Sequence, residues 1–233
     1  MMGTQILNPN VSTNLVDVGS SVASVQIDQQ LWHDPVDNPQ LCLFTQMGNN
    51  RPWWNVFGAD RGSHKHQGVD LLAIPETQAY ACVSGTVVRS ELATSIYGHV
   101  VTIRADSPDF VRSLKTDYKL AYPEHGELEA GKGWSDQGHF YFFYAHLLER
   151  SVKVGDPVTP KTPIGLTGTS SYGKSKDPHL HFEILCVERT TGTNMRVNPA
   201  RYMKFKMPNQ LTAEEIEYQK WVASKFWIGM KTK

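Results

Sequence analysis

Short runs of β-branched and aromatic residues, separated by glycine, proline and other turn-forming residues, recur between about residues 68 and 187. Runs of this length with turn signals between them are typical of strands in an antiparallel sheet. The sequence therefore predicts a mainly β domain built on an antiparallel β-sheet. The expected strands are residues 68–74, 78–83, 85–91, 99–104, 140–145, 153–158 and 180–187.

One part of this region lacks the strand pattern. Residues 106–139 contain no alternating apolar run, and their second half is rich in glycine. Connections of this length without regular structure are uncommon inside a compact domain and are usually functional. We therefore expect residues 106–139 to form an insertion loop in the β domain.

The two ends of the chain differ from its centre. Residues 1–50 are rich in Asn, Ser and Gln and predict an N-terminal extension, which leaves residues 51–205 for the β domain. Residues 206–233 predict a C-terminal helix, because Thr212 and Glu215 have the spacing of a capping box. A helix that binds a membrane surface or a protein partner is the alternative interpretation. The face expected to pack on the domain comprises Tyr218, Trp221, Val222 and Phe226.

Composition and charge narrow the functional classes. With 40% hydrophobic and 20% charged residues, the 233-residue chain is globular and neither disordered nor fibrous. Its 23 Lys and Arg balance 23 Asp and Glu, so no basic excess is present to neutralise phosphates, and nucleic acid is not an expected partner. The sequence shows neither a secretory signal peptide nor a transmembrane segment of about 18 apolar residues, which predicts a soluble chain.

The three cysteines, Cys42, Cys82 and Cys186, are far apart and form no C-x-x-C pair. We expect them to be small buried apolar side chains, and neither a disulfide framework nor a cysteine zinc site is indicated. A Cys42–Cys82 disulfide is the alternative.

Histidine is the residue type that points to chemistry. His179 and His181 are two residues apart in an expected strand, so both imidazoles project from the same face. Such a pair is either half of a zinc or copper site or an ordinary surface pair. His66 and Asp70 could converge on the same ion if the chain turns at Gly68.

Two further histidines bear on this site. His64 is the alternative to His66 as a ligand, and His146 ends an apolar expected strand, where a structural histidine is common. A ligand set of His, Asp and His leaves one position for water, which is the arrangement of catalytic zinc sites. The three patterns together favour a metal site accompanied by two more histidines.

Several short motifs follow one another between about residues 62 and 200. They are His66-x-Gly68-x-Asp70, Gly85-Thr86-Val87-Val88, Tyr97-Gly98-His99-Val100-Val101, Tyr144-Ala145-His146-Leu147, Val154-Gly155-Asp156-Pro157-Val158, Ile164-Gly165-Leu166-Thr167-Gly168 and Pro178-His179-Leu180-His181-Phe182-Glu183. This ordered set resembles the lysostaphin/LytM-type zinc endopeptidases, which are peptidoglycan hydrolases. The resemblance implies a β fold of the duplicated-hybrid-motif type for the catalytic domain.

The resemblance also implies the roles of the site residues. His66, Asp70 and His181 would bind one Zn²⁺ per chain, and His146 and His179 would be the catalytic pair that does not bind metal. In this scheme His179 is the general base, and His146 stabilises the tetrahedral oxyanion or donates a proton to the leaving amine. The two roles could be exchanged.

The chain departs from the family pattern in three places. His99 stands where relatives usually have Asn, and we expect an ordinary strand residue there. Residues 53–61 contain no tyrosine, whereas some relatives have an oxyanion-stabilising tyrosine shortly before the first ligand. The insertion at residues 106–139 replaces a short turn of the family, and we expect it to change substrate specificity.

By this resemblance the chain is a metalloendopeptidase that hydrolyses peptide cross-links or stem peptides of bacterial peptidoglycan, in the periplasm or the extracellular cell wall. There are two alternatives. One is a non-catalytic LytM-like regulator, and the other is a cell-wall-binding module in which Trp53, Trp54 and Trp134 stack on sugars. Since no export signal is recognised, the chain is either trimmed of its signal, part of a larger protein, or an antibacterial toxin delivered by a specialised secretion system. The toxin would have a cognate immunity protein as a partner.

Overall fold

The structure, a computed structural model, describes residues 31–45, 49–94, 96–171, 178–188, 192 and 194–228. Within these residues the chain builds a nine-stranded sheet in which every pairing is antiparallel. The mainly β fold with an antiparallel sheet is thereby confirmed. The strands are β1 (Val69–Leu72), β2 (Gln78–Tyr80), β3 (Gly85–Leu92), β4 (His99–Ala105), β5 (His139–Arg150), β6 (Pro157–Val158), β7 (Pro163–Thr167), β8 (His179–Val187) and β9 (Asn194–Val197).

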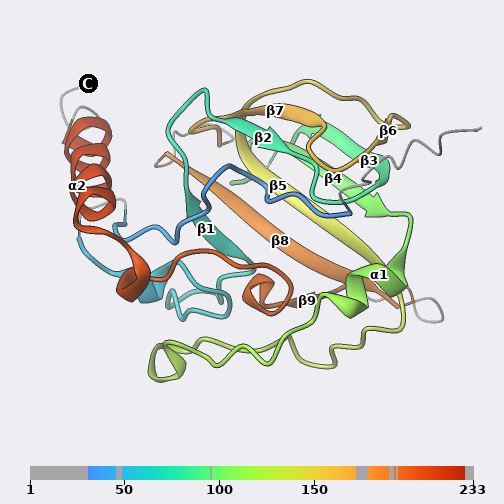
Figure 1. The fold of residues 1–233 in the computed structure, drawn as a ribbon, viewed down its shortest axis with the longest axis horizontal. Helices are drawn as coiled ribbons and strands as arrows, with labels where there is room; N and C mark the ends of the chain where they lie inside the picture. The colour runs from blue at the N-terminus through green and yellow to red at the C-terminus, as the bar shows by residue number, and fades with distance from the viewer. Residues whose placement is uncertain are drawn as a thin grey trace, which may run out of the picture.

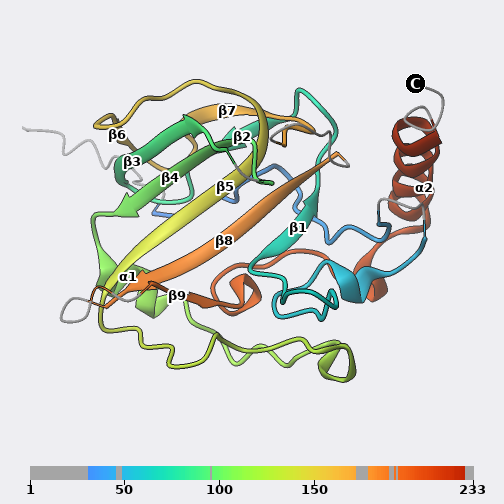
Figure 2. The same ribbon diagram turned by 180° about the vertical axis from the view of Figure 1, so that it is seen from behind.

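Two long strands, β5 and β8, form the centre of the sheet (Figures 1 and 2). The main path runs β1-β8-β5-β4-β3-β6, while β9 pairs with β8, and β7 joins β5 to β2. Because side chains alternate between the faces of a strand, the order of residues in β8 sends large apolar side chains to one face and His179, His181 and Glu183 to the other.

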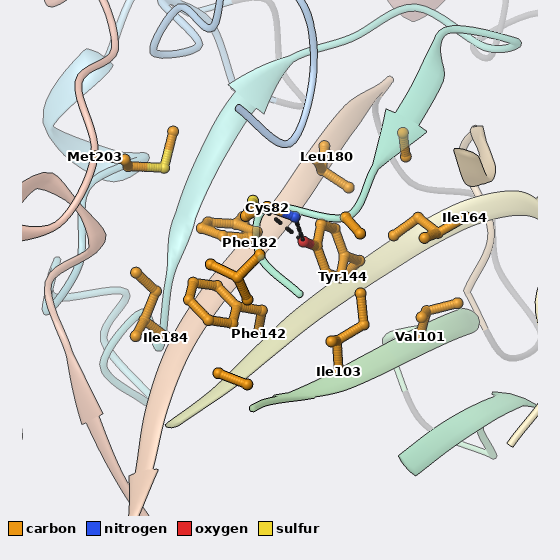
Figure 3. Packing of buried hydrophobic residues seen from close by; sticks show 14 of the residues in the cluster. Cys82, Val101, Ile103, Phe142, Tyr144, Ile164, Leu180, Phe182, Ile184 and Met203 are labelled. Atoms are coloured by element: carbon orange, nitrogen blue, oxygen red, sulfur yellow. Dashed lines mark hydrogen bonds between the residues drawn. The ribbon is translucent and has the colours of Figure 1, made fainter. Parts of the chain in front are cut away.

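The apolar face carries the main core (Figure 3). Phe142 and Tyr144 of β5 pack against Phe182 of β8, with ring centroids 6.2 and 5.2 Å from it. The buried Tyr144 hydroxyl accepts a hydrogen bond from the Cys82 backbone N–H at 3.1 Å and donates to the Cys82 sulfur at 3.2 Å. The buried hydroxyl is therefore paired, and it ties β5 to the segment between β2 and β3.

All three cysteines are buried and unbonded to one another, as predicted. The strand expected at residues 153–158 is reduced to β6, because Gly155 has a φ of +95° and the Lys153 N–H donates to Asp156 in a turn. Strands β7 and β9 were not predicted.

The described part of the expected N-terminal extension lies against the sheet. Leu41 pairs with Leu71 of β1, and the Cys42 N–H donates to the Asp70 carbonyl at 3.0 Å. Val36 and Trp32 pack in or against the main core, and Figure 1 shows this segment (blue) crossing the sheet. These contacts fix β1, the strand that carries Asp70.

The helices are α1 (Pro108–Ser113) and α2 (Ala213–Ile228), with 3-10 turns at Pro52–Trp54, Pro123–His125, Pro199–Arg201 and Pro208–Gln210. The predicted C-terminal helix is confirmed, and it stands to one side of the sheet (Figure 1). Its predicted capping box is present, with Thr212 N–H to Glu215 Oε2 at 3.0 Å and Glu215 N–H to Thr212 Oγ1 at 3.2 Å. None of the described helices is long and apolar enough to cross a membrane.

The predicted packing face of α2 is right for Val222 and wrong for Tyr218 and Trp221. Tyr218 and Trp221 are 42% and 45% exposed and stack on each other, whereas Gln219, Val222 and Ala223 are buried. The Gln219 amide explains the difference, because it hydrogen-bonds the backbone of residues 41 and 43 and so turns its own face of the helix inward.

Candidate active site

The pairing of β1 with β8 brings the first two site residues together. Asp70 is directly opposite His181, and Leu72 is opposite His179. Paired residues on one face have neighbouring side chains, so the Asp70 carboxylate meets the His181 imidazole. Gly68 permits this approach: a Cβ there would lie 2.3 Å from the Phe182 carbonyl oxygen. The glycine is needed for close packing, and its φ is not in the left-handed region.

His66 reaches the same point from the loop that precedes β1. Its backbone N–H donates to the Ala59 carbonyl at 3.0 Å, and the Gly58 N–H donates to the His66 carbonyl at 2.8 Å. This ladder aims the His66 imidazole at Asp70. His64, the alternative ligand, is exposed, and its ring contacts the Ser63 hydroxyl instead.

Three ligand atoms converge in this cluster. His66 Nε2 lies 3.1 Å from both His181 Nδ1 and Asp70 Oδ1, and His181 Nδ1 lies 3.0 Å from Asp70 Oδ1. Ligand atoms around a tetrahedral ion with bonds of about 2.0 Å are about 3.3 Å apart, so the observed separations fit zinc closely. All three side chains are buried, and they form a group that could hold a metal ion.

The outer nitrogen of each histidine is held by an acceptor. His66 Nδ1 lies 2.9 Å from the Val56 carbonyl oxygen, and His181 Nε2 lies 2.9 Å from Glu183 Oε1. Because both oxygens can only accept a hydrogen bond, each ring in its neutral form carries its proton on the outer nitrogen. The lone pair of its other nitrogen then faces the cluster. Two lone pairs and a carboxylate oxygen facing one another require a cation between them, which is the donor set of a metal site.

The electrostatics of the cluster centre on the negative charge of Asp70. Burial, followed by the charge of Arg61, lowers the pKa of His66 to about 4 against the opposing effect of Asp70. Burial alone would lower the pKa of His181, but its hydrogen bonds to Asp70 and Glu183 raise it to about 9. Burial would raise the pKa of Asp70. The charges of His66, His179 and Arg61 nevertheless hold this pKa well below its usual range. The ionised carboxylate thus attracts a cation, a proton or a metal ion.

His146 and His179 lie beside the cluster. Their ring centroids are 4.8 Å apart in an edge-to-face arrangement, and His179 Nε2 is 3.4 Å from Asp70 Oδ1. His146 Nδ1 donates to the Ser170 carbonyl at 2.9 Å, so its Nε2 carries the lone pair. Burial, followed by the charges of His179 and His181, places the pKa of His146 well below its usual value. His146 is therefore neutral at pH 7.

The five predicted site residues share one cleft of about 500 Å³. Trp54, Arg61 and Tyr97 also line it. His99 is not among its lining residues, and its backbone N–H donates to Ser170 Oγ at 2.8 Å, which fits the expected role as a strand residue.

Sequence reasoning missed two residues that contact the predicted ligands. Glu183 holds His181, and the alternation of β8 could have revealed it, because it lies two residues after His181 on the same face. Arg61 donates to Asp70 Oδ2 at 2.6 Å, and no periodic pattern in the loop indicates that contact.

Comparison with known protein families finds one family that part of the chain resembles. The sequence model of peptidase family M23 matches residues 130–199. This segment is therefore similar to the sequences of that family. The M23 segment contains His146, His179 and His181, whereas His66 and Asp70 precede it. The match confirms the resemblance predicted from the sequence.

Several solved structures are similar to parts of the chain. The catalytic domain of lysostaphin from Staphylococcus simulans is 21% identical, over 63% of this chain and 86% of that chain, with a TM-score of 0.42. A mutant catalytic domain of the prophage-encoded M23 protein EnpA from Enterococcus faecalis is 20% identical, over 64% and 88%, with a TM-score of 0.42. A zinc containing peptidase from Vibrio cholerae is 18% identical, over 77% and 41%, with a TM-score of 0.43. Among curated proteins, none matches the chain.

Proposed function

We propose that the chain is a zinc-dependent endopeptidase that hydrolyses peptide cross-links or stem peptides of bacterial peptidoglycan. The convergence of His66 Nε2, Asp70 Oδ1 and His181 Nδ1 within 3.1 Å of one another carries the proposal. The M23 match supports a peptidase. The enzyme would act on the cell wall, in the periplasm or outside the cell. Delivery by a specialised secretion system, with an immunity protein in the producer, stays a prediction.

His66, Asp70 and His181 would hold the zinc ion. When bound, zinc supplies a Lewis acid that polarises the scissile carbonyl and acidifies water. Glu183 and the Val56 carbonyl keep the two histidine rings in the tautomers that the ion needs.

His146 and His179 would move the protons. The hydrogen bond of His146 Nδ1 to the Ser170 carbonyl leaves a lone pair on Nε2. His146 would first accept the proton of the attacking water there and later return it to the leaving amine. His179 Nε2 lies 3.4 Å from Asp70 Oδ1, at the edge of the cluster, and this ring would stabilise negative charge on the substrate. This is the exchanged order of roles that the sequence left open.

Paired substitutions separate metal binding from proton transfer. We expect the wild-type protein to bind one equivalent of zinc and to release peptides from purified sacculi. His181→Ala should lose zinc and activity together. His146→Ala should keep zinc and lose hydrolysis about 10²- to 10⁴-fold, the usual contribution of a general acid–base.

His125→Ala is the control, because this histidine stacks on Trp53 and does not line the cleft. Zinc content and muropeptide mass spectra are the measurements, and the spectra also identify the bond that is cut. A wild-type protein that binds zinc but releases no peptide would be a non-catalytic member. One that binds no zinc would contradict the proposal altogether.

A further inference from the structure

The two oxygens of Asp70 have different partners. Oδ1 faces the cluster, 3.1 Å from His66 Nε2 and 3.0 Å from His181 Nδ1. Oδ2 faces away and accepts a hydrogen bond from Arg61 Nη2 at 2.6 Å. A charge-assisted bond of this length holds the oxygen firmly and engages one of its two lone pairs. The positive charge of Arg61 beside Oδ2 also disfavours a cation there.

Arg61 itself is anchored independently of Asp70. Its Nε and Nη2 both donate to the Trp54 carbonyl, at 3.2 and 2.9 Å, and its guanidinium carbon lies 5.9 Å from the centre of the Trp54 ring. Its side chain is 19% exposed. The planar guanidinium is therefore fixed in direction before it meets the carboxylate, which a flexible lysine at this position would not be.

We propose that Arg61 is a positioning residue that restricts Asp70 to a single metal-binding oxygen. A carboxylate can bind a metal ion through one oxygen or two, and catalytic zinc sites combine three protein ligands with one position for water or substrate. By holding Oδ2, Arg61 prevents the second oxygen from filling that position. It also withdraws negative charge from Asp70, so that the ion stays a stronger Lewis acid.

This inference rests on the proposed function, since it concerns the same metal site, but its main test does not use activity. Cobalt(II) replaces zinc in such sites, and its visible absorption is strong in four-coordinate sites and weak in five-coordinate ones. We expect Arg61→Met to bind Co²⁺ with lower molar absorption than the wild type. Its affinity for the ion should be equal or higher, because a positive charge is lost and an oxygen is gained. With zinc fully bound, kcat should fall about 10- to 100-fold.

A purely structural role for Arg61 predicts the opposite affinity change. If the residue only ties the loop to β1, its loss disorders the site and weakens Co²⁺ binding without a change of coordination. Arg112→Met is the matched control. Arg112 also contacts a carboxylate, a backbone carbonyl and an aromatic ring, namely those of Asp109, Asp136 and Phe140, far from the cleft. It should leave the cobalt spectrum and kcat unchanged.

Arg61→Lys carries the test if Arg61→Met does not fold. It keeps the charge but cannot span Asp70 and the Trp54 carbonyl with a fixed fork, so a smaller fall in absorption is expected. An unchanged cobalt spectrum in a folded Arg61 variant overturns the inference. A wild type that binds Co²⁺ in a four-coordinate site but does not hydrolyse peptidoglycan overturns the proposed reaction and leaves the role of Arg61 intact.

Discussion

His146 has a backbone conformation that few residues other than glycine adopt. Its φ is +61°, in the left-handed region, within a strand. The pairing of β5 with β4 and with β7 shifts register next to it, and its N–H donates to the Tyr97 carbonyl at 2.9 Å. This bend turns the imidazole toward His179. The strained backbone at His146 therefore positions a side chain of the site and does not improve strand pairing.

Two substitutions at position 146 separate backbone strain from side-chain chemistry. Asn tolerates the left-handed region, whereas the β-branched Val does not. We expect His146→Asn and His146→Val both to be inactive, with His146→Val less stable by about 1–2 kcal/mol. Urea unfolding measures the difference. Equal stability of the two variants would mean that the strand relaxes to an ordinary conformation.

The residues of the site were accessible to sequence reasoning where a regular strand carries them. Alternation along β8 places His179 and His181 on one face, and the antiparallel neighbour supplies Asp70. The left-handed bend at His146 and the contact of Arg61 with Asp70 depend on how irregular segments fold back. No local pattern encodes such contacts.

At the scale of elements, α2 is attached through a polar side chain. Gln219 is 2% exposed; its Oε1 accepts from the Leu43 N–H at 2.9 Å, and its Nε2 donates to the Leu41 carbonyl at 3.2 Å. The helix thereby pairs backbone groups of the segment that lies along β1. Each of these groups would be costly to bury without a partner.

Gln219→Leu tests this attachment. Leucine fills a similar volume but leaves the backbone groups of residues 41 and 43 unpaired, so we expect a loss of about 1–3 kcal/mol in unfolding free energy. Trp221→Ala, at an exposed position of the same helix, should change it by less than about 0.5 kcal/mol. Thermal or urea unfolding checks both. A larger effect at Trp221 would restore the aromatic face that the sequence predicted.

The elements that sequence reasoning found are those with uninterrupted local signals. The capping box located α2, and β-branched runs located β3, β4 and β8. Strand β7 begins with Pro163 and has Gly165 at its centre, which breaks the pattern, although the residues still pair with β5 and β2. Tertiary pairing overrides weak local preference in such segments.

At the scale of the whole molecule, the insertion braces the loop that carries His66 and Arg61. The Leu128 N–H donates to the Phe57 carbonyl at 3.2 Å, and the Asp60 N–H donates to the His125 carbonyl at 3.1 Å. On its other side, the Gly131 N–H donates to the Arg196 carbonyl at 2.8 Å. Figures 1 and 2 show the insertion (green) running along the edge of the molecule below β9. Its length was evident from the sequence, but these non-local partners were not.

Glu127 holds the insertion in its fold. The carboxylate is 2% exposed, and Oε2 accepts from the Ala121 and Tyr122 N–H groups at 2.7 Å each. Oε1 accepts from the Tyr118 hydroxyl at 2.9 Å and from Asn198 Nδ2 at 3.0 Å. Each of these groups donates a hydrogen bond to the carboxylate, so both of its oxygens must be acceptors.

Glu127→Gln places an amide NH₂ against one pair of these donors. We expect a loss of about 1–3 kcal/mol in unfolding free energy, because a buried donor then faces donors. Hydrogen exchange should accelerate at residues 118–131 and at 57–60, which the insertion braces, while the amides of β5 and β8 stay protected. Glu124→Gln, an exposed acid three residues away, should change the free energy by less than about 0.5 kcal/mol. If exchange at residues 57–60 is unchanged in Glu127→Gln, the insertion lies on the loop without supporting it.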